Sequence, residues 1–332
     1  MHYLIYFFSA LLISMLITYS VNILFRKYNV YDIPCERSSH HIPTPRSGGL
    51  GIVLSWLIIL VLSGKLNYIY FFPIIIAVIG FIDDLKSLPI IVRFSIQAII
   101  SLIVILFGIS FESINIPIFG NFNLGILSIP LTLLWFVSIT NIYNFMDGID
   151  GLAGGVGFII AVFMTYIAWK YGQIDILLCS IILAGGILGF TFFNFPPAKI
   201  FMGDTGSTFL GFLFAILSVK LSNNGINLLA IIILFGAFIF DTTVTLIRRI
   251  LKGEKWFMSH RTHFYQRLLK LGYSHFTVTI GEYIITLILG LLSLGYLQVH
   301  DSLKIIFLFL SFCLLAGNAL WITYMEKKKG IL

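Results

Sequence analysis

The residues best suited to chemistry in this sequence stand together at positions 141–151, between two apolar stretches. Asn141, Asn144, Asp147 and Asp150 supply two amides and two carboxylates, in a chain that is 59% hydrophobic and only 11% charged. Asn, Asp and Gly also favour turns, so a turn with helix caps is the simpler interpretation. Polar groups beside a membrane span are costly unless they face water or a ligand, and their number here favours a ligand site.

Two further acidic motifs lie at the ends of apolar stretches. Asp83 and Asp84 are adjacent carboxylates, which repel each other unless one is protonated or a cation neutralises them. On a helix they point about 100° apart, so one could bind a metal while the other contacts a substrate. Asp204, in Gly-Asp-Thr-Gly-Ser, could cap a helix, while Gly203 and Gly206 would also allow backbone N–H groups to approach a phosphate, and the two interpretations are compatible. A solvated helix end is the alternative for the acidic pair.

Basic side chains are concentrated in two polar segments. Residues 38–49 are rich in Pro and Gly and form either an ordinary turn or a phosphate contact with His41 and Arg46 as cations. The neighbouring pair His40 and His41 lacks the further Cys or His spacing of a zinc site. The longer segment, residues 247–275, contains apolar residues at the spacing of an amphipathic helix, which predicts a helix at the membrane surface. It also carries His260, Arg261 and His263, which suit a diphosphate.

The acidic and basic groups make chemical sense together. Carboxylates at one surface would repel an anionic substrate, but they suit Mg²⁺, with Mn²⁺ as a substitute, which takes oxygen ligands and bridges phosphates. The basic residues then suit the anion itself: Arg46, Arg248, Arg249, Arg261 and Arg267. The pattern predicts metal-assisted phosphoryl transfer to or from a membrane-embedded substrate.

The elements that position these groups are membrane helices. A chain of 332 residues with a mean hydropathy of +1.01 and many long apolar runs is typical of an all-α polytopic membrane protein. A β-barrel would show short alternating segments instead. Eleven spans are predicted, at about 2–24, 48–63, 68–82, 90–110, 126–140, 152–169, 175–192, 205–221, 226–246, 276–297 and 303–324.

Charge predicts the orientation of the spans. The first span has no basic segment before it and Arg26 and Lys27 after it, so it is not read as a signal peptide and its N-terminus is expected outside. With that orientation, 17 of the 21 Lys and Arg residues fall on the inner side. The active region and the C-terminus are therefore expected at the cytoplasmic face of one membrane domain, 1–332. Its cytoplasmic loops are expected at about 25–47, 83–89, 141–151, 193–204 and 247–275.

At these motifs the chain resembles the polyprenyl-phosphate N-acetylhexosamine-1-phosphate transferases, the MraY/WecA/TagO group of glycosyltransferase family 4. The resemblance covers the chain from about Arg37 to His275 and rests on four motifs. These are Pro-Thr-Pro-Arg-x-Gly-Gly, Asp83-Asp84, the Asn141–Leu152 string, and Asn194-Phe-Pro-Pro-Ala-Lys-Ile-Phe-Met-Gly-Asp204-x-Gly-Ser. The string His-Arg-Thr-His-Phe-Tyr-Gln looks most like the O-antigen-initiating WbpL/WbcO branch.

The resemblance implies transfer of a sugar 1-phosphate from a UDP-N-acetylhexosamine to undecaprenyl phosphate, with release of UMP. It implies Asp204 as the principal Mg²⁺ ligand and Asn144 as a second. The catalytic residues implied are Asp83, Asp84, Asp147 and His263, and the substrate-binding residues are Asn141, Asp150, Thr44, Arg46, Lys199, His260 and Arg261. Whether Asp83 or Asp84 forms a phospho-enzyme or acts as a base stays open.

This sequence departs from the family pattern at two places. Tyr265 and Gln266 stand where many relatives have histidines after the position of His263. Lys86 follows the acidic pair by two residues where relatives have a Lys after three, so Arg93 is the candidate substitute.

We expect a bacterial inner-membrane enzyme that initiates a cell-surface polysaccharide and contacts the lipid bilayer but no nucleic acid; a homodimer is compatible with its apolar surface. A transporter or flippase for a nucleotide-sugar or lipid-linked sugar is the main alternative, and an inactive scaffold is a second.

Overall fold

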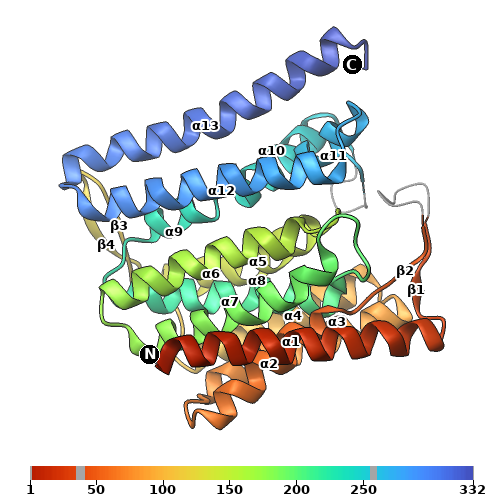
Figure 1. Ribbon diagram of the computed structural model, residues 1–332. Coiled ribbons are helices and arrows are strands. Elements are labelled where there is room, and N and C mark those ends of the chain that lie inside the picture. Colours follow the sequence, from red (N-terminus) through yellow and green to blue (C-terminus); the bar gives the residue numbers. More distant parts are fainter. Residues whose placement is uncertain (1, 35–41, 255–259, 332) are drawn as a thin grey trace.

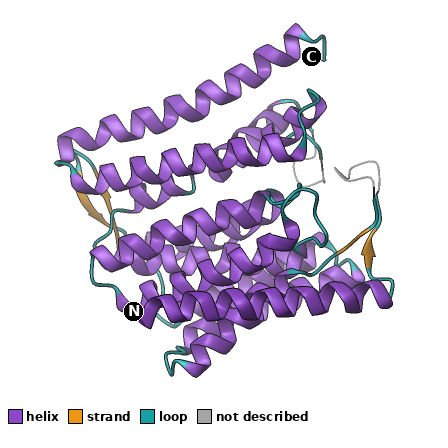
Figure 2. Cartoon of the chain, viewed as in Figure 1, coloured by secondary structure: helices purple, strands orange, loops and turns teal. Residues whose placement is uncertain are grey.

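The computed structural model describes residues 2–34, 42–254 and 260–331. The described chain is a bundle of helices that run along a common direction (Figure 1), with two short antiparallel strand pairs at its ends (Figure 2). The first pair joins β1 (Tyr31–Asp32) to β2 (Thr44–Pro45), and the second joins β3 (Ser113–Ile116) to β4 (Gly120–Asn123). The α-helices are α1 (His2–Lys27), α2 (Gly49–Leu62), α3 (Phe71–Lys86), α4 (Ile90–Leu106), α5 (Ser128–Phe145), α6 (Leu152–Lys170), α7 (Ile174–Asn194), α8 (Gly203–Asn223), α9 (Leu228–Leu234), α10 (Gly236–Leu251), α11 (Phe264–Lys270), α12 (His275–Gln298) and α13 (Asp301–Lys328).

The all-α polytopic membrane fold expected from the sequence is confirmed. In the described ranges, eight helices are long and apolar enough to cross a membrane, and the bent pair α9 and α10 passes the same test together. Two shorter apolar helices, α2 and α4, occupy the remaining predicted spans. The chain begins and ends at opposite ends of the bundle (Figure 1), as an odd number of spans requires.

The span expected at 226–246 is bent. This segment breaks into α9 and α10, which meet at an angle of 80°. The break falls between Leu234 and Gly236, and sharp helix bends commonly occur at glycine. After the bend, α10 carries Asp241 to the N-terminus of α11, where the carboxylate accepts hydrogen bonds from the backbone.

Several polar residues expected in loops belong to helix ends instead. α3 continues through Asp83 and Asp84, and α5 continues through Asn141 and Asn144. The amide of Asn141 donates a hydrogen bond to the carbonyl oxygen of Val137 at 2.7 Å, one turn earlier in α5. This hydrogen bond holds the Asn141 amide against α5, so the packing of α5 determines where the amide lies.

The central element is α8. In its 18-residue apolar segment 89% of the residues are buried, against 11% in the corresponding segment of α13. Two glycines permit the close packing around it. A Cβ at Gly80 of α3 would collide with the backbone carbonyl of Asp204, and a Cβ at Gly49 of α2 would collide with the backbone of Gly206. α3 and α8 therefore lie in backbone contact at the end of the bundle that carries their carboxylates.

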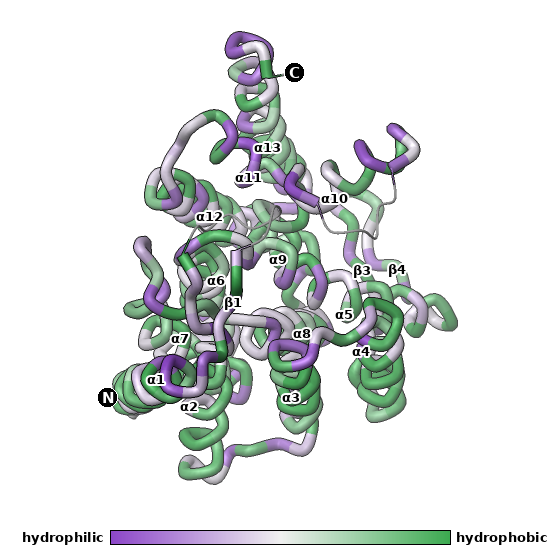
Figure 3. Tube along the Cα trace, turned by 90° about the vertical axis from the view of Figure 1, so that its right-hand side faces the viewer, coloured by the Kyte–Doolittle hydropathy of each residue, from purple (hydrophilic) through white to green (hydrophobic). Residues whose placement is uncertain are grey.

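That end of the bundle also carries β1, β2, α11 and the C-terminus (Figure 1). Figure 3 looks onto this end and shows hydrophilic segments gathered where the helices end, while the outward faces of α3 and α4 are hydrophobic. The helix predicted within 247–275 is present as α11, and most of its residues, including Gln266 and Arg267, are buried.

Candidate active site

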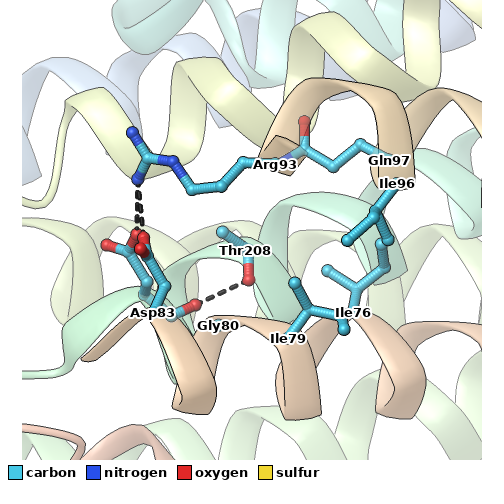
Figure 4. Close-up of a pocket in the computed structure, with 9 residues that line it drawn as sticks. Ile76, Ile79, Gly80, Asp83, Arg93, Ile96, Gln97 and Thr208 are labelled. Atoms are coloured by element: carbon cyan, nitrogen blue, oxygen red, sulfur yellow. Dashed lines mark hydrogen bonds and ion pairs between the residues drawn. The ribbon is translucent and has the colours of Figure 1, made fainter. Parts of the chain in front are cut away.

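Asp83 on α3 and Asp204 on α8 are joined by one cation, Arg93 of α4. A single guanidinium nitrogen of Arg93 lies 2.7 Å from Asp83 Oδ2 and 2.8 Å from Asp204 Oδ2 (Figure 4). The other oxygen of Asp83 accepts a hydrogen bond from the backbone N–H of Leu88. Asp83 is buried, while the side chain of Arg93 is 32% exposed. Three helices thus place two carboxylates around a guanidinium that solvent or a ligand can reach.

Asp84, next to Asp83, is turned toward the start of α8. Its Oδ2 accepts hydrogen bonds from the hydroxyls of Ser47 at 2.7 Å and Thr205 at 2.6 Å. Its Oδ1 accepts from the backbone N–H of Asp204 at 2.9 Å. A carboxylate in this place satisfies the free N–H groups of a helix N-terminus and is stabilised by the helix dipole. Asp83 therefore lies beside Asp204, and we call these two carboxylates and Arg93 the acidic cluster. Asp84 instead positions Asp204.

The two amides of α5 have different neighbours. Asn144 donates from Nδ2 to Asp204 Oδ1 at 2.9 Å and to the hydroxyl of Ser207 at 2.9 Å, so it joins the acidic cluster. Asn141 lies one turn earlier and donates to Oε1 of Gln97 on α4 at 2.6 Å. The pairing of Asn144 with Asp204 is the one that the resemblance implied.

Asp147 lies in the turn between α5 and α6 and is partly exposed. Burial of its carboxyl raises the pKa well above the usual value, and the negative charges of Asp204 and Asp84 raise that pKa further. Asp147 is therefore coupled electrostatically to Asp84 and Asp204.

Asp150, in the same turn as Asp147, contacts the segment that contains Lys199. Asp150 Oδ2 accepts from the backbone N–H of Ala198 at 3.0 Å, and Oδ1 lies 3.2 Å from Nδ1 of His275 at the start of α12. Lys199, the next residue after Ala198, is exposed. Asn141 and Asp150, which the resemblance implied in one pocket, are thus held by separate partners.

The segment with Thr44 and Arg46 runs beside the start of α8. The backbone N–H of Phe201 donates to Pro45 O at 2.8 Å, and the N–H of Gly48 donates to Phe201 O at 2.8 Å. Thr44 is buried in β2. Arg46 is half-buried, and its Nε is buried without a hydrogen-bond partner among the described residues. The structure does not describe His40 and His41, so their expected role lies outside the described residues.

The histidines expected near a diphosphate are adjacent. The rings of His260 and His263 have their centroids 4.9 Å apart, and Nδ1 of His263 lies 3.0 Å from Oδ1 of Asp241. Burial, and then the nearby His263 and Arg249, lower the pKa of His260 to about 4. Arg261, the next residue, is half-buried. His260 is therefore a neutral ring at pH 7, while His263 has a carboxylate partner.

A cavity of about 920 Å³ extends from His260 and His263 along the helices. Its walls are mainly apolar and come from α4, α5, α9 and α10, reaching Phe111, Ile114 and Leu228 at the far end. Polar residues line the end that carries the candidate site: Arg93, Asn141, Asn144, His260, His263 and Gln266. The arrangement suits an elongated ligand with an apolar body and an anionic head.

Two basic residues expected to meet an anion are paired within the protein. Arg267 forms a two-pronged ion pair with Glu326 of α13, with Nε 2.9 Å from Oε1, and both side chains are buried. Arg249 lies 2.8 Å from Glu254. The prediction that Arg267 contacts a ligand is therefore replaced by a structural role, because its guanidinium ties α11 to α13.

Sequence reasoning considered Arg93 only as a substitute and missed two other residues. Lys86 is exposed, whereas Arg93 reaches the acidic cluster. Gln97 and Asp241 were not among the expected site residues. Both are polar groups inside apolar stretches, which is itself a signal of function in a membrane protein.

The residues of the cluster fit a magnesium ion. Asp204, Asp83 and Asn144 offer carboxylate and amide oxygens, and one guanidinium does not balance the acidic groups around it. Within the described ranges there is no group of three or more His, Cys, Asp or Glu side chains arranged to hold a metal. Mg²⁺ commonly binds through one or two carboxylates, with waters and substrate phosphates as its other ligands.

Comparison with known proteins gives consistent matches. Residues 66–222 match the family model described as glycosyl transferase family 4. The chain is 36% identical over 317 residues to the Bacillus subtilis (strain 168) protein named "Probable undecaprenyl-phosphate N-acetylglucosaminyl 1-phosphate transferase", covering 92% of this chain and 88% of that one. It is 31% identical over 316 residues to the decaprenyl-phosphate N-acetylglucosaminephosphotransferase of Mycobacterium leprae (strain TN), covering 83% and 79%. A phospho-N-acetylmuramoyl-pentapeptide-transferase of Clostridium botulinum (strain Alaska E43 / Type E3) is 34% identical over 221 residues, covering 62% and 67%.

Proposed function

This chain belongs to glycosyl transferase family 4, within the polyprenyl-phosphate N-acetylhexosamine-1-phosphate transferases, and from that premise we propose that it transfers a sugar 1-phosphate from a UDP-N-acetylhexosamine to undecaprenyl phosphate. The products are UMP and a polyprenyl diphosphate-linked sugar. N-acetylglucosamine is the first sugar to test, because the names of two long-matching relatives specify it.

The observation that carries the proposal is the shape and lining of the 920 Å³ cavity. A polyprenyl phosphate has a long apolar chain and a phosphate at one end. Apolar walls would hold the chain by the hydrophobic effect, while Arg93 and Asn144 at the polar end would receive the phosphate. The acceptor oxygen would then lie next to Asp83, which shares the guanidinium of Arg93.

In the reaction, an oxygen of the lipid phosphate attacks the β-phosphorus of the UDP-sugar. A new P–O bond forms there, and the bond from the β-phosphorus to the UMP oxygen breaks, so that UMP carries away the bonding electrons. Arg93 offers donors to phosphoryl oxygens at the polar end of the cavity. The unpartnered Nε of Arg46 is a further donor for the anionic nucleotide.

Within this proposal, Asp204 would hold Mg²⁺ with help from Asn144 and Asp83. When bound, the ion supplies positive charge that offsets the charge developing on the departing UMP. Asp84 would act indirectly, because its hydrogen bonds to Thr205 and to the backbone of Asp204 fix the start of α8.

The apolar helices and the relatives also support a place for the enzyme in the bacterial inner membrane, with its active site on the cytoplasmic side. The O-antigen, capsule or wall polymer that it would initiate remains a prediction, as does a homodimer. A transporter is not favoured, since the polar residues of the cavity are gathered at one end and the matching relatives are named as transferases.

The decisive experiment measures UMP release by the purified protein with undecaprenyl phosphate, Mg²⁺ and a panel of UDP-N-acetylhexosamines. We expect release that requires the lipid, prefers one sugar and stops with EDTA. Asp204→Asn should lower turnover at least 100-fold, and the matched substitution Asp175→Asn at the other end of the bundle should not. No UMP release from folded protein with any sugar of the panel would refute the proposal.

A further inference from the structure

The inference concerns Asp241, an acid that the proposed chemistry does not yet use. Asp241 lies on α10 and is only 4% exposed. A buried carboxylate in a membrane helix is costly unless its oxygens are satisfied by donors. Here the donors all come from α10 itself and from the N-terminus of α11.

The donors around Asp241 are two backbone N–H groups, one hydroxyl and one imidazole nitrogen. Its Oδ1 accepts from the backbone N–H of Phe264 at 3.0 Å and from the hydroxyl of Thr245 at 3.1 Å. Its Oδ2 faces the backbone N–H of Tyr265 at 3.4 Å. Nδ1 of His263 lies 3.0 Å from Oδ1. The carboxylate thus holds both the first turn of α11 and the imidazole that precedes it.

This contact fixes which nitrogen of His263 carries a hydrogen. Oδ1 of Asp241 accepts from the N–H of Phe264 and from the hydroxyl of Thr245, so Nδ1 of His263 is the donor in its contact with the same oxygen. The remaining ring nitrogen, Nε2, is then the one available to a ligand. His263 lines the cavity beside Asn144 and His260, where the proposed phosphoryl groups would lie.

The ring plane of His263 is fixed as well. It stacks on the ring of Tyr265 with centroids 5.8 Å apart and planes 14° from parallel. Tyr265 is itself held, because its hydroxyl donates to the carbonyl oxygen of Phe145 at 3.1 Å. The seven residues of α11 are too few to form a stable helix unaided, so these contacts determine where His263 sits.

We propose that Asp241 is a positioning residue for the transferase: it holds His263 in the Nδ1–H form, with Nε2, the acceptor nitrogen of that form, presented to the polar end of the cavity where the substrates would react. This inference rests on the proposed function. It also accounts for a carboxylate that the bend between α9 and α10 brings to the site.

The test is a double-mutant cycle with Asp241→Asn and His263→Asn in the UMP-release assay. Asparagine keeps one oxygen to accept from the N–H groups of α11, but its NH2 group can donate to Nδ1 of His263, so the Nδ1–H form is no longer required. We expect Asp241→Asn to lower kcat/KM about 10- to 100-fold, the range found when partners that orient functional histidines are removed. If Asp241 acts through His263, the double variant should be no slower than His263→Asn alone.

Two control substitutions separate positioning from general destabilisation. Glu326→Gln loosens α11 at its other attachment, to Arg267, and its effect should multiply with that of His263→Asn. Asp175→Asn changes a carboxylate at the opposite end of the bundle and should leave kcat/KM unchanged. If Asp241→Asn fails to fold, the same cycle with Asp241→Glu decides, with the same non-additivity expected.

Wild-type kcat/KM in Asp241→Asn, or effects of the two substitutions that multiply, would overturn the inference while leaving the transferase in place. A wild-type protein that releases no UMP would instead refute the proposed function.

Discussion

Replacement of Arg93 by methionine should destabilise the protein and make it depend on magnesium. The guanidinium makes charge-assisted hydrogen bonds of 2.7 and 2.8 Å to two carboxylates. Each such bond contributes about 1.5–3 kcal/mol, and the lower value applies because the side chain of Arg93 is 32% exposed. Arg93→Met should therefore lose about 3 kcal/mol of unfolding free energy.

The same geometry predicts how the loss is recovered. Because one nitrogen touches both oxygens, Asp83 Oδ2 and Asp204 Oδ2 lie at most about 5.5 Å apart, and without Arg93 they repel. A divalent cation would replace the missing charge. At a concentration of 100 times its Kd, the ion adds about 2.7 kcal/mol, nearly the whole loss. In the wild type the gain should be smaller, because Arg93 already occupies the two oxygens.

Thermal unfolding in detergent, with MgCl₂ or with EDTA, measures both effects. The matched control is Lys304→Met, which removes a cation from a surface pair with Asp301 at the opposite end of the bundle. That variant should lose at most about 1 kcal/mol and show the wild-type response to Mg²⁺. An equal stabilisation of wild type and Arg93→Met by Mg²⁺ would refute the reasoning, because it would mean that ion and guanidinium do not share the two carboxylates.

Three other predictions use the same kind of measurement. Asp84→Asn should lose about 1–3 kcal/mol, because an amide cannot accept from all the donors that the carboxylate satisfies; unchanged thermal stability would argue against the capping role. His260 has a folded-state pKa of about 4, below the usual value of about 6.5. The unfolded chain therefore binds the proton more readily, so the free energy of unfolding falls as pH falls from about 6.5 toward 4. His260→Gln should flatten that part of the curve of stability against pH. Parallel curves for wild type and variant would contradict the prediction. Arg267→Met should cost about 3–5 kcal/mol, since it leaves Glu326 buried and unpaired, and adding Glu326→Leu should restore most of the loss; a double variant as unstable as the single one would count against the pair.

The sequence was sufficient to predict the membrane fold and the face that carries the site. Eleven apolar segments and a strong excess of Lys and Arg on one side determine both, because hydropathy and charge act along the chain and need no tertiary information. The link between Asn144 and Asp204 was also expected, but only through resemblance. No local rule joins residues that are 60 positions apart.

The roles of Asp83 and Asp84 could not be divided by sequence. Adjacent residues on a helix point about 100° apart, so the pattern said that the two carboxylates would differ but not which would face α8. Close packing at Gly80 decides the matter. It seats α3 against the N-terminus of α8, so that Asp84 meets the free N–H groups and Asp83 meets Arg93.

The bend between α9 and α10 was hidden for a different reason. The segment 226–246 is apolar throughout, and an apolar run has the same hydropathy whether its helix is straight or broken. Yet the bend determines the site, because a straight helix would continue in the direction of α9 instead of turning by 80° at Gly236. The turned segment both lines the apolar cavity and carries Asp241 to His263. An isolated acid in a predicted span is therefore better evidence of a bent helix that reaches a polar site than of a straight helix buried in lipid.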